Sequence, residues 1–355
     1  MCLITGVIIL IIGNNGFTSA GNLDCISDNN TSCSLSGIIM YVGGSGPGNY
    51  SSIQDAIDDA SDGDTVFVYD DSSPYYENII IEKSLVLKGE NRNTTIIDGN
   101  WNEGYVLRIE ADYVEVSGFT IINSGNAIEM WSNHSSINDN VITNNLWTGI
   151  FLYKSRDTII FKNNITNNSG RGIDLLGCSN NIIMENEITK HNWEGINLEY
   201  SICNNISRNV ISDNTDNINF HFFSSGNIIR KNIISNSRDW GIQIMYGSDN
   251  NTICSNTLAN NEYCGLQLDT SGNIVCCNNF INNKARHVTF ARITLVTTII
   301  NFNKWYGNYW DNWIGLEQPS YSRFPKIIVG HLTRGIPKIP SFAFDWHPAK
   351  EPYDI

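Results

Sequence analysis

Short segments in which apolar and polar residues alternate recur through the middle of the chain at intervals of about 23 residues. Ile150–Leu152, Ile173–Leu175 and Ile196–Leu198 are three of these segments. Alternation with a period of two points one set of side chains inward and the other outward, as in a half-buried β-strand. A repeat of this length holds about three short strands, so the pattern predicts stacked coils whose strands form parallel sheets with a spacing of roughly 4.8 Å.

Four columns of similar residues run in step with these segments. Two of them contain Asn140, Asn163, Asn186, Asn209, Asn232, Asn256 and Asn279, and Ile128, Ile150, Ile173, Ile196, Ile218, Ile242 and Leu266. The other two contain Ser132, Ser155, Cys178, Ser201, Ser224, Ser248 and Ser271, and Ile137, Ile160, Ile183, Ile206, Ile229, Ile253 and Cys276. Stacked Ile side chains fill the interior, and stacked Asn amides pair from coil to coil at the corners. The sequence therefore predicts an all-β fold, a right-handed parallel β-helix.

The two ends of the chain depart from the repeat. Residues 51–60 predict an amphipathic helix, capped by Ser51 or Ser52, that covers the open end of the solenoid. The periodicity fades after about Asn283, which predicts an irregular C-terminal cap. The predicted organisation is a signal peptide at 1–20, an N-terminal segment at 21–39, a strand and helix cap at 40–64, the β-helix at 65–283 and the C-terminal cap at 284–355.

The N-terminus and the composition predict an exported protein. The apolar run 3–12 and the small residues Thr18-Ser19-Ala20 fit a signal peptide, although a basic first region is missing. The alternatives are a start further upstream and a buried first strand. No later stretch is long and apolar enough to span a membrane. We expect a secreted or cell-surface monomer.

The net charge and the cysteine content indicate which partners and which disulfides can be expected. A formal charge of -14 leaves no basic surface for nucleic acid, so none is expected as a partner. The chain has nine cysteines, of which eight remain if Cys2 leaves with the signal peptide. Export permits disulfides, but the sequence does not assign their pairing.

Three segments carry a resemblance to a known family. They are Ser52–Val66, Tyr76–Gly99 and Asn308–Trp313, on either side of the Asn-rich repeat. Together they resemble the NosD-like family, a branch of the pectin-lyase-like superfamily of carbohydrate-binding proteins and sugar hydrolases. The resemblance covers nearly all of residues 40–350. It implies a single-stranded right-handed parallel β-helix and, for NosD itself, a role in copper delivery.

The outward face of the strand that follows each Gly is the candidate binding surface. Aromatic rings stack on the apolar faces of sugars, while carboxylates and amides bind hydroxyl groups. The candidate carbohydrate-binding residues are Glu129, Trp131, Trp147, Tyr153, Asp174, Trp193, Glu199, Trp240, Tyr263 and Asp269. A polysaccharide or surface glycan is therefore the expected partner. The alternative is that the aromatic residues only cover the corners of the coils.

Catalysis and metal binding have weaker candidates. Hydrolysis needs a pair of carboxyl groups, which Asp174 and Glu199 on adjacent coils could supply, and a lyase needs a base, for which Arg171 is the candidate. Apart from Asn214-Thr215-Asp216, the motifs of polygalacturonases and alginate epimerases are absent. His221 and Met245 share a column and could bind copper. Calcium is the other possible metal, although no clear cluster of aspartates marks a site for it. No cofactor is required. Non-catalytic carbohydrate binding is the favoured prediction, with a polysaccharide lyase, hydrolase or epimerase and a copper-binding protein as alternatives.

Overall fold

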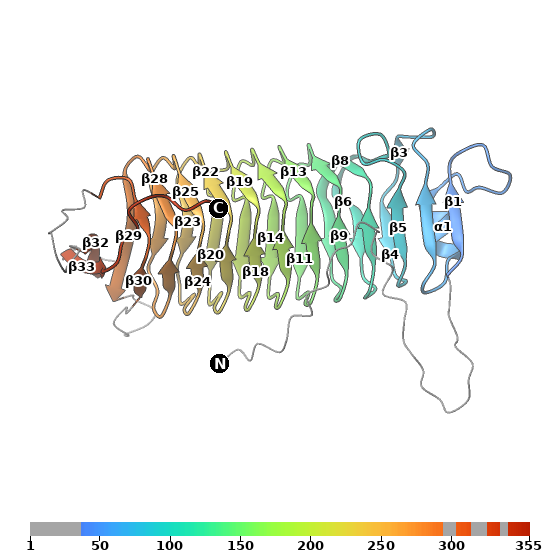
Figure 1. Ribbon diagram of the computed structural model, residues 1–355. Coiled ribbons are helices and arrows are strands. Elements are labelled where there is room, and N and C mark those ends of the chain that lie inside the picture. The colour runs from blue at the N-terminus through green and yellow to red at the C-terminus, as the bar shows by residue number, and fades with distance from the viewer. Residues whose placement is uncertain (1–36, 294–302, 314–324, 334–339) are drawn as a thin grey trace, which may run out of the picture.

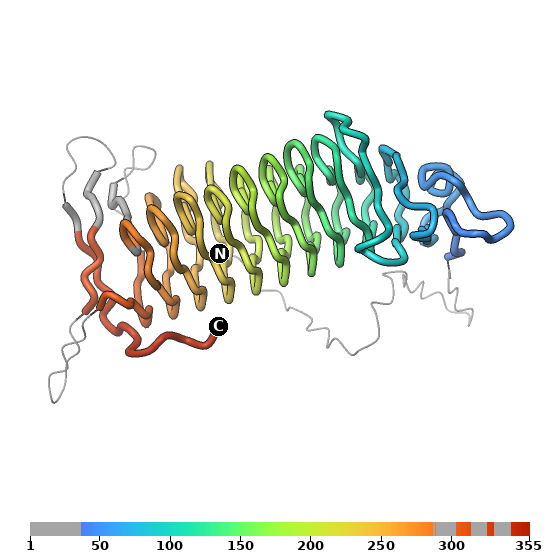
Figure 2. Tube along the Cα trace, turned by 90° about the horizontal axis from the view of Figure 1, so that it is seen from above, coloured from blue at the N-terminus to red at the C-terminus, as the bar shows by residue number. Residues whose placement is uncertain are grey.

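The computed structural model describes residues 37–293, 303–313, 325–333 and 340–355, and the predicted signal peptide lies outside them. The chain forms an elongated right-handed parallel β-helix, as predicted (Figure 1, Figure 2). Three sheets run along its length. The first sheet contains β1 (Ile39–Val42), β2 (Thr65–Val68), β5 (Val86–Gly89), β7 (Glu115–Ser117), β9 (Ser136–Asn138), β12 (Ile159–Phe161), β15 (Ile182–Met184), β18 (Asn205–Ser207), β21 (Ile228–Arg230), β24 (Thr252–Cys254), β27 (Ile274–Cys276) and β30 (Lys304–Tyr306).

The other two sheets are joined at their N-terminal ends by two long strands, β6 (Ile96–Ile109) and β8 (Thr120–Met130). The second sheet contains β3 (Tyr75–Tyr76), β10 (Val141–Thr143), β13 (Asn164–Thr166), β16 (Glu187–Thr189), β19 (Val210–Ser212), β22 (Ile233–Ser235), β25 (Thr257–Ala259), β28 (Asn279–Ile281) and β31 (Tyr309–Trp310). The third contains β4 (Ile79–Ile81), β11 (Ile150–Tyr153), β14 (Ile173–Leu176), β17 (Ile196–Glu199), β20 (Ile218–His221), β23 (Trp240–Ile244), β26 (Cys264–Leu268) and β29 (Arg286–Ile293).

Identical apolar residues stack inside the solenoid. Ile150 pairs with Ile173, which pairs with Ile196, and all three side chains are fully buried. Ile160 and Ile183 form the corresponding pair in the first sheet. Because successive strands are in register, each inward side chain packs on its counterpart in the next coil, and the predicted apolar columns are confirmed.

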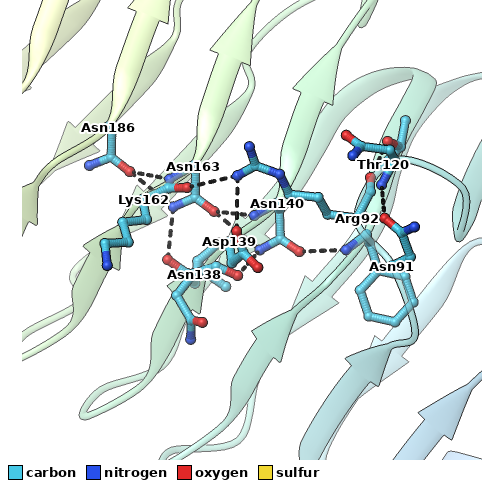
Figure 3. Close-up of polar contacts among 12 residues, drawn as sticks. Asn91, Arg92, Thr120, Asn138, Asp139, Asn140, Lys162, Asn163 and Asn186 are labelled. Atoms are coloured by element: carbon cyan, nitrogen blue, oxygen red, sulfur yellow. Dashed lines mark hydrogen bonds and ion pairs between the residues drawn. The ribbon is translucent and has the colours of Figure 1, made fainter. Parts of the chain in front are cut away.

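Buried asparagines form hydrogen-bonded ladders at the corners. The side-chain amide of Asn140 donates to Oδ1 of Asn163 at 3.2 Å, and that of Asn163 donates to Asn186 at 3.0 Å (Figure 3). The backbone N–H of each residue donates to the same oxygen of the next, so one carbonyl accepts two bonds. The ladder continues through Asn209, Asn232, Asn256, Asn278 and Asn308. It satisfies backbone groups that the tight corners would otherwise leave unpaired in the interior.

The predicted columns slip by one residue in the last regular coil. The ladder there passes through Asn278 and not Asn279, and Val275 and not Cys276 pairs with Ile253. Thr270 rather than Ser271 is the buried residue at the corner. The cause is a coil spacing of 22 residues at this point, where the preceding ladder spacing is 24. A one-residue slip exchanges the two faces of a strand, so the error reverses which side chains point outward.

The repeat also extends beyond the boundary predicted at residue 283. Asn273 and Asn278 donate to Asn303 and Asn308, each 30 residues further on. The longer spacing interrupts the sequence periodicity, although the ladder continues. Asp345 then terminates this ladder, because its buried carboxylate accepts from the backbone N–H of Asn308 at 2.9 Å.

Each end of the solenoid is covered by a different element. Helix α1 (Ile53–Asp59) covers the N-terminal end, with Ser52 as its N-cap. The carboxylate of Glu77 accepts from the backbone N–H groups of Ile53 and Gln54, both at 2.9 Å, which satisfies the start of the helix. At the C-terminal end, β32 (Lys326–Thr333) and β33 (Pro340–Asp345) pair antiparallel, and β32 continues the third sheet beside β29.

Candidate functional site

The candidate site lies on the outward face of the third sheet. Asp174, Asn197, Asn219, Gln243 and Gln267 follow one another in register from β14 to β26. Their side chains form a continuous polar row beside a second row that includes Glu199 and His221 on β17 and β20.

Arg171 is the centre of a cluster of acidic side chains. Its guanidinium contacts Asp174 Oδ2 at 2.8 Å and Glu194 Oε2 at 2.7 Å, and it lies 4.0 Å from Glu199 Oε1. The structure therefore brings together Arg171, Asp174 and Glu199, as expected. Glu194 was not predicted, although it stands in the same column as Arg171, 23 residues further on. Column alignment of the residue two before each strand would have found it.

Burial and neighbouring charges shift the pKa values of Arg171 and Asp174 in this cluster. Burial alone would lower the pKa of Arg171, but Asp174 and Glu194 outweigh it and raise that pKa above its ordinary value. Burial raises the pKa of Asp174, and Arg171 offsets part of the rise. Arg171 thus keeps its proton firmly, which suits a structural cation and not a general base.

Four buried polar atoms next to this cluster have no hydrogen-bond partner. They are Asn197 Oδ1, Asn219 Oδ1, His221 Nε2 and Trp240 Nε1. A buried polar atom without a partner costs about 1–3 kcal/mol. Native proteins keep few such atoms, and here they lie on three adjacent strands, β17, β20 and β23.

Exposed aromatic residues border the polar row on the side that precedes each strand. Trp147, Trp193 and Tyr263 are 49%, 58% and 45% exposed. The ring of Trp193 lies 5.5 Å from the guanidinium of Arg171, and Trp240 packs edge-on against Tyr263 with centroids 5.3 Å apart. These rings stand where the sequence predicted them, and only Trp240 is largely covered.

A second aromatic border, not predicted, follows the same strands. Tyr200 stacks on Phe222 at 5.7 Å, and Phe222 stacks on Tyr246 at 5.2 Å, with interplanar angles of 13° and 15°. Each ring comes directly after Glu199, His221 or Met245 in the sequence. The signal was available as a column of aromatic residues at one corner. The polar row from β17 to β23 therefore lies between two aromatic borders.

The remaining predicted binding residues lie on the same face, away from Arg171. Trp131 and Tyr153 contact one another at 5.6 Å on the N-terminal coils, and Arg108 lies 4.2 Å over the ring of Trp131. Glu129 accepts from Asn126 at 2.9 Å. Asp269, on the C-terminal side, is buried and accepts from Gln267 at 2.8 Å. The predicted set is thus distributed along the solenoid and not gathered at one point.

Two groups of residues have the chemistry to hold copper. Met245 follows β23 beside His221, because its backbone N–H donates to Phe220 at 3.0 Å, which agrees with the predicted column. The sulfur atoms of Cys254, Cys276 and Cys277 all lie within 4.8 Å of one another. Among the described residues, this trio is the group of three His, Cys, Asp or Glu ligands close enough to share an ion. Thiolates suit copper(I), but Cys254 Sγ and Cys276 Sγ are 2.8 Å apart, which leaves no space for an ion bonded to both.

Asp216 gives the site a measurable pH dependence. Burial raises the pKa of Asp216 to about 7, and Glu194 and Asp239 contribute further. Between about pH 4 and 7 the folded state retains a proton that the unfolded state has lost, so stability falls as the pH rises through this window. At pH 8 we expect Asp216→Asn to be more stable than the wild type by on the order of 2–4 kcal/mol and so to unfold at a higher temperature. At pH 3.5 the two proteins should unfold at the same temperature. Thermal unfolding at the two pH values checks this, and equal midpoints at pH 8 would contradict it.

The fold defines the class of the protein, a right-handed parallel β-helix. The chain belongs to the NosD family, described as periplasmic copper-binding proteins, whose model matches residues 21–188, 57–239 and 175–315. A cell surface glycoprotein of Methanothermus fervidus is 34% identical over 103 residues. That match covers 29% of this chain and only 16% of the glycoprotein. The protein is accordingly secreted or located at the cell surface.

Solved structures support the fold. XylC in complex with xylose has a TM-score of 0.60 at 13% identity, and the match covers 69% of this chain and 70% of XylC. The Dettilon tailspike protein scores 0.58 at 15% identity, over 72% and 62% of the two chains. An alginate lyase from Paenibacillus sp. scores 0.55 at 15% identity, over 70% and 99%. At these identities the likeness is one of fold alone. In the described ranges, no helix has the length and hydrophobicity to cross a membrane.

Proposed function

We propose that the protein binds an extended polysaccharide along the outward face of the third sheet, without cleaving it. The observation that carries the proposal is the polar row from β17 to β23 between two borders of aromatic rings, in which Trp193 is 58% and Tyr200 is 53% exposed. The aromatic borders on both sides supply stacking surfaces for sugar rings. Polar groups between stacking rings are the arrangement that sugar recognition requires.

The charge of the face selects the kind of sugar. Arg171 contacts two carboxylates and lies near a third, so this part of the site carries excess negative charge. A uronate polymer would add negative charge beside Asp174 and Glu194, and like charges at close range oppose binding. A neutral or amino-sugar polymer meets no such repulsion. We therefore propose a polymer of one of these two types.

A second candidate function is hydrolysis of the same polymer. Asp216, with a pKa of about 7, can hold a proton at neutral pH as a general acid must. Glu194 contributes to this raised pKa, so the two carboxyl groups interact electrostatically. Glycoside hydrolysis uses a pair of carboxyl groups, one as the acid and the other as the base or nucleophile. Release of reducing ends from a bound polymer would favour this candidate over simple binding.

Calorimetric titration with neutral, amino-sugar and uronate oligosaccharides tests the proposal. We expect Trp193→Ala and Tyr200→Ala, one from each border, to weaken binding of the preferred oligosaccharide about tenfold, which corresponds to the loss of one stacking contact of about 1.4 kcal/mol. Tyr76→Ala is the matched control, because Tyr76 is 65% exposed but belongs to the second sheet. Tight uronate binding, or equal affinities for all three variants, would refute the proposed site.

A further inference from the structure

Two cysteine side chains are in direct contact on the outward side of the first sheet. Cys254 and Cys276 are the last residues of β24 and β27, and the two residues pair in register. Their sulfur atoms are 2.8 Å apart. Non-bonded carbon atoms pack at about 3.5–4.0 Å, and sulfur is a larger atom, so these two atoms are closer than ordinary packing brings them.

The strand register gives the backbone spacing that a disulfide requires. Neighbouring strands lie about 4.7–4.9 Å apart, and disulfides join residues whose Cα atoms are about 4.4–6.8 Å apart. The sulfur atoms need to approach by about 0.8 Å to reach the bond length of about 2.05 Å, which rotation of the side chains can supply. The other strand cysteine in the described ranges, Cys264, pairs with Trp240 and Arg286 and has no cysteine opposite it.

A third thiol stands beside this pair. Cys277 follows Cys276 at a corner with a φ of +53°, and the three sulfur atoms lie within 4.8 Å of one another. In the stack of coils Cys277 lies over Ser255 and not over Cys254, so the register favours a bond between Cys254 and Cys276. Burial raises the pKa of Cys277, so its thiol keeps its proton at neutral pH and attacks a neighbouring disulfide only slowly.

The location of the protein supplies oxidising conditions. The chain is secreted or located at the cell surface, where disulfides form and persist. Cys276 is buried, and burial raises the pKa of its thiol to about 12. Cys254 is only half-buried. An oxidant in solution therefore reaches the sulfur of Cys254 first.

We propose that Cys254 and Cys276 form a disulfide that joins two successive coils, while Cys277 remains a thiol beside it. The oxidant is an extracellular disulfide, either of a small thiol such as glutathione or of a thiol oxidoreductase. The Cys254 thiolate attacks one sulfur of that disulfide and displaces the other as a thiolate. Cys276 then loses its proton and attacks Cys254 Sγ, which displaces the second thiolate. The chain loses two electrons and two protons, and the oxidant takes them up as two thiols.

The bond lies where the solenoid loses its regular spacing. The inward column passes from Ile253 to Val275 and then to Trp305, and the next coil of the ladder is 30 residues long. Coils near the end of a repeat protein separate most easily, because fewer neighbours hold them. A disulfide across the 22 residues between the two cysteines keeps β27 attached to β24 and restricts the unfolded chain.

The chain itself supplies tolerated substitutions for the test. Ser207 occupies the position of Cys254 two coils earlier, and Ser255 occupies the position of Cys277 one coil earlier with a φ of +56°. Serine should therefore fit at both positions without altering the backbone. Cys203→Ser, at another corner, is the cysteine control.

The bond is mapped by mass spectrometry of the full-length protein after incubation with oxidised glutathione, alkylation in denaturant and digestion without reductant. Cleavage after Glu262 and before Asp269 places Cys254, Cys264 and the Cys276–Cys277 pair on three separate fragments. We expect the first and third fragments to be joined, with one alkylated cysteine on the third. The link should persist in Cys277→Ser and in Cys203→Ser.

Thermal unfolding before and after reduction measures what the bond contributes. Reduction should lower the unfolding midpoint of the wild type by on the order of 5 °C more than that of the double variant Cys254→Ser/Cys276→Ser. Cys203→Ser should respond to reduction as the wild type does.

Two outcomes would overturn the proposal. One is complete alkylation of Cys254 after incubation with oxidised glutathione, which would show that the pair stays reduced. The other is loss of the link in Cys277→Ser, which would assign the bond to Cys277 and leave Cys276 as the thiol.

Discussion

Replacing Asn209 by alanine is expected to lower the free energy of unfolding by about 3–5 kcal/mol. Asn209 Oδ1 accepts from both the backbone and the side-chain N–H of Asn186, at 2.9 and 3.0 Å. Its amide donates to the carbonyl of Ile183 and to Asn232 Oδ1, at 2.9 and 3.0 Å. All these groups are buried, and alanine would leave the backbone N–H of Asn186 without its partner and remove one bond each from the Asn186 amide, the Ile183 carbonyl and Asn232 Oδ1. Urea unfolding followed by circular dichroism measures the loss.

Asn205→Ile is the matched control for this prediction. Asn205 lies on the outward side of β18, and its Oδ1 has no partner. Its register neighbours are Ile182 and Ile228, so isoleucine would complete an apolar row and leave stability unchanged or raise it by about 0.2–1 kcal/mol. If both variants lost stability equally, asparagine content alone and not the ladder would account for the effect.

Arg171→Met is expected to cost about 3–5 kcal/mol at neutral pH. The side chains of Asp174 and Glu194 are only 12% and 14% exposed, and both would lose their cation. The cost should shrink at pH 4, because burial raises the pKa of Asp174 and its protonation removes one of the unpaired charges. The triple variant Arg171→Met/Asp174→Asn/Glu194→Gln should recover most of the stability at pH 7. Denaturant unfolding of the three proteins at both pH values checks each statement.

The control for the Arg171 prediction is an exposed ion pair. Arg92 contacts Asp139 at 2.9 Å, with side chains 37% and 60% exposed (Figure 3). Arg92→Met should change the free energy of unfolding by about 0–1 kcal/mol, because solvent screens both charges. A loss as large as that of Arg171→Met would mean that burial does not govern the energy of these pairs.

Most of the fold could be predicted because each coil repeats the same arrangement of strands, corners and inward apolar residues. Ile150, Ile173 and Ile196 recur at nearly constant spacing, and constant spacing is what register between parallel strands requires. The prediction failed where the spacing changed. Between Asn256 and Asn278 the interval is 22 residues, and between Asn278 and Asn308 it is 30. A fixed period cannot follow such changes, so Asn279 and Cys276 were assigned to the wrong columns.

The candidate site was predictable as a surface but not as a set of contacts. The columns place Asp174 beside Asn197 and Glu199 beside His221, and the structure agrees. They do not show that Arg171 turns toward Glu194, because that depends on side-chain conformation. The stack of Tyr200, Phe222 and Tyr246 depends on left-handed corner residues, with φ values of +50°, +41° and +52°. The cysteine trio required the correct register of the last coil.

Hydroxyl-radical footprinting with and without the preferred polysaccharide tests the central claim most directly, since it reports which aromatic side chains the polymer covers. The aromatic borders of the third sheet should be protected, with Trp193, Tyr200 and Tyr263 showing the largest decrease in oxidation. Tyr76 and Trp101, exposed elsewhere on the solenoid, should be oxidised as before. Protection of Tyr76 and Trp101 with unchanged oxidation of Trp193 and Tyr200 would show that the polymer binds elsewhere.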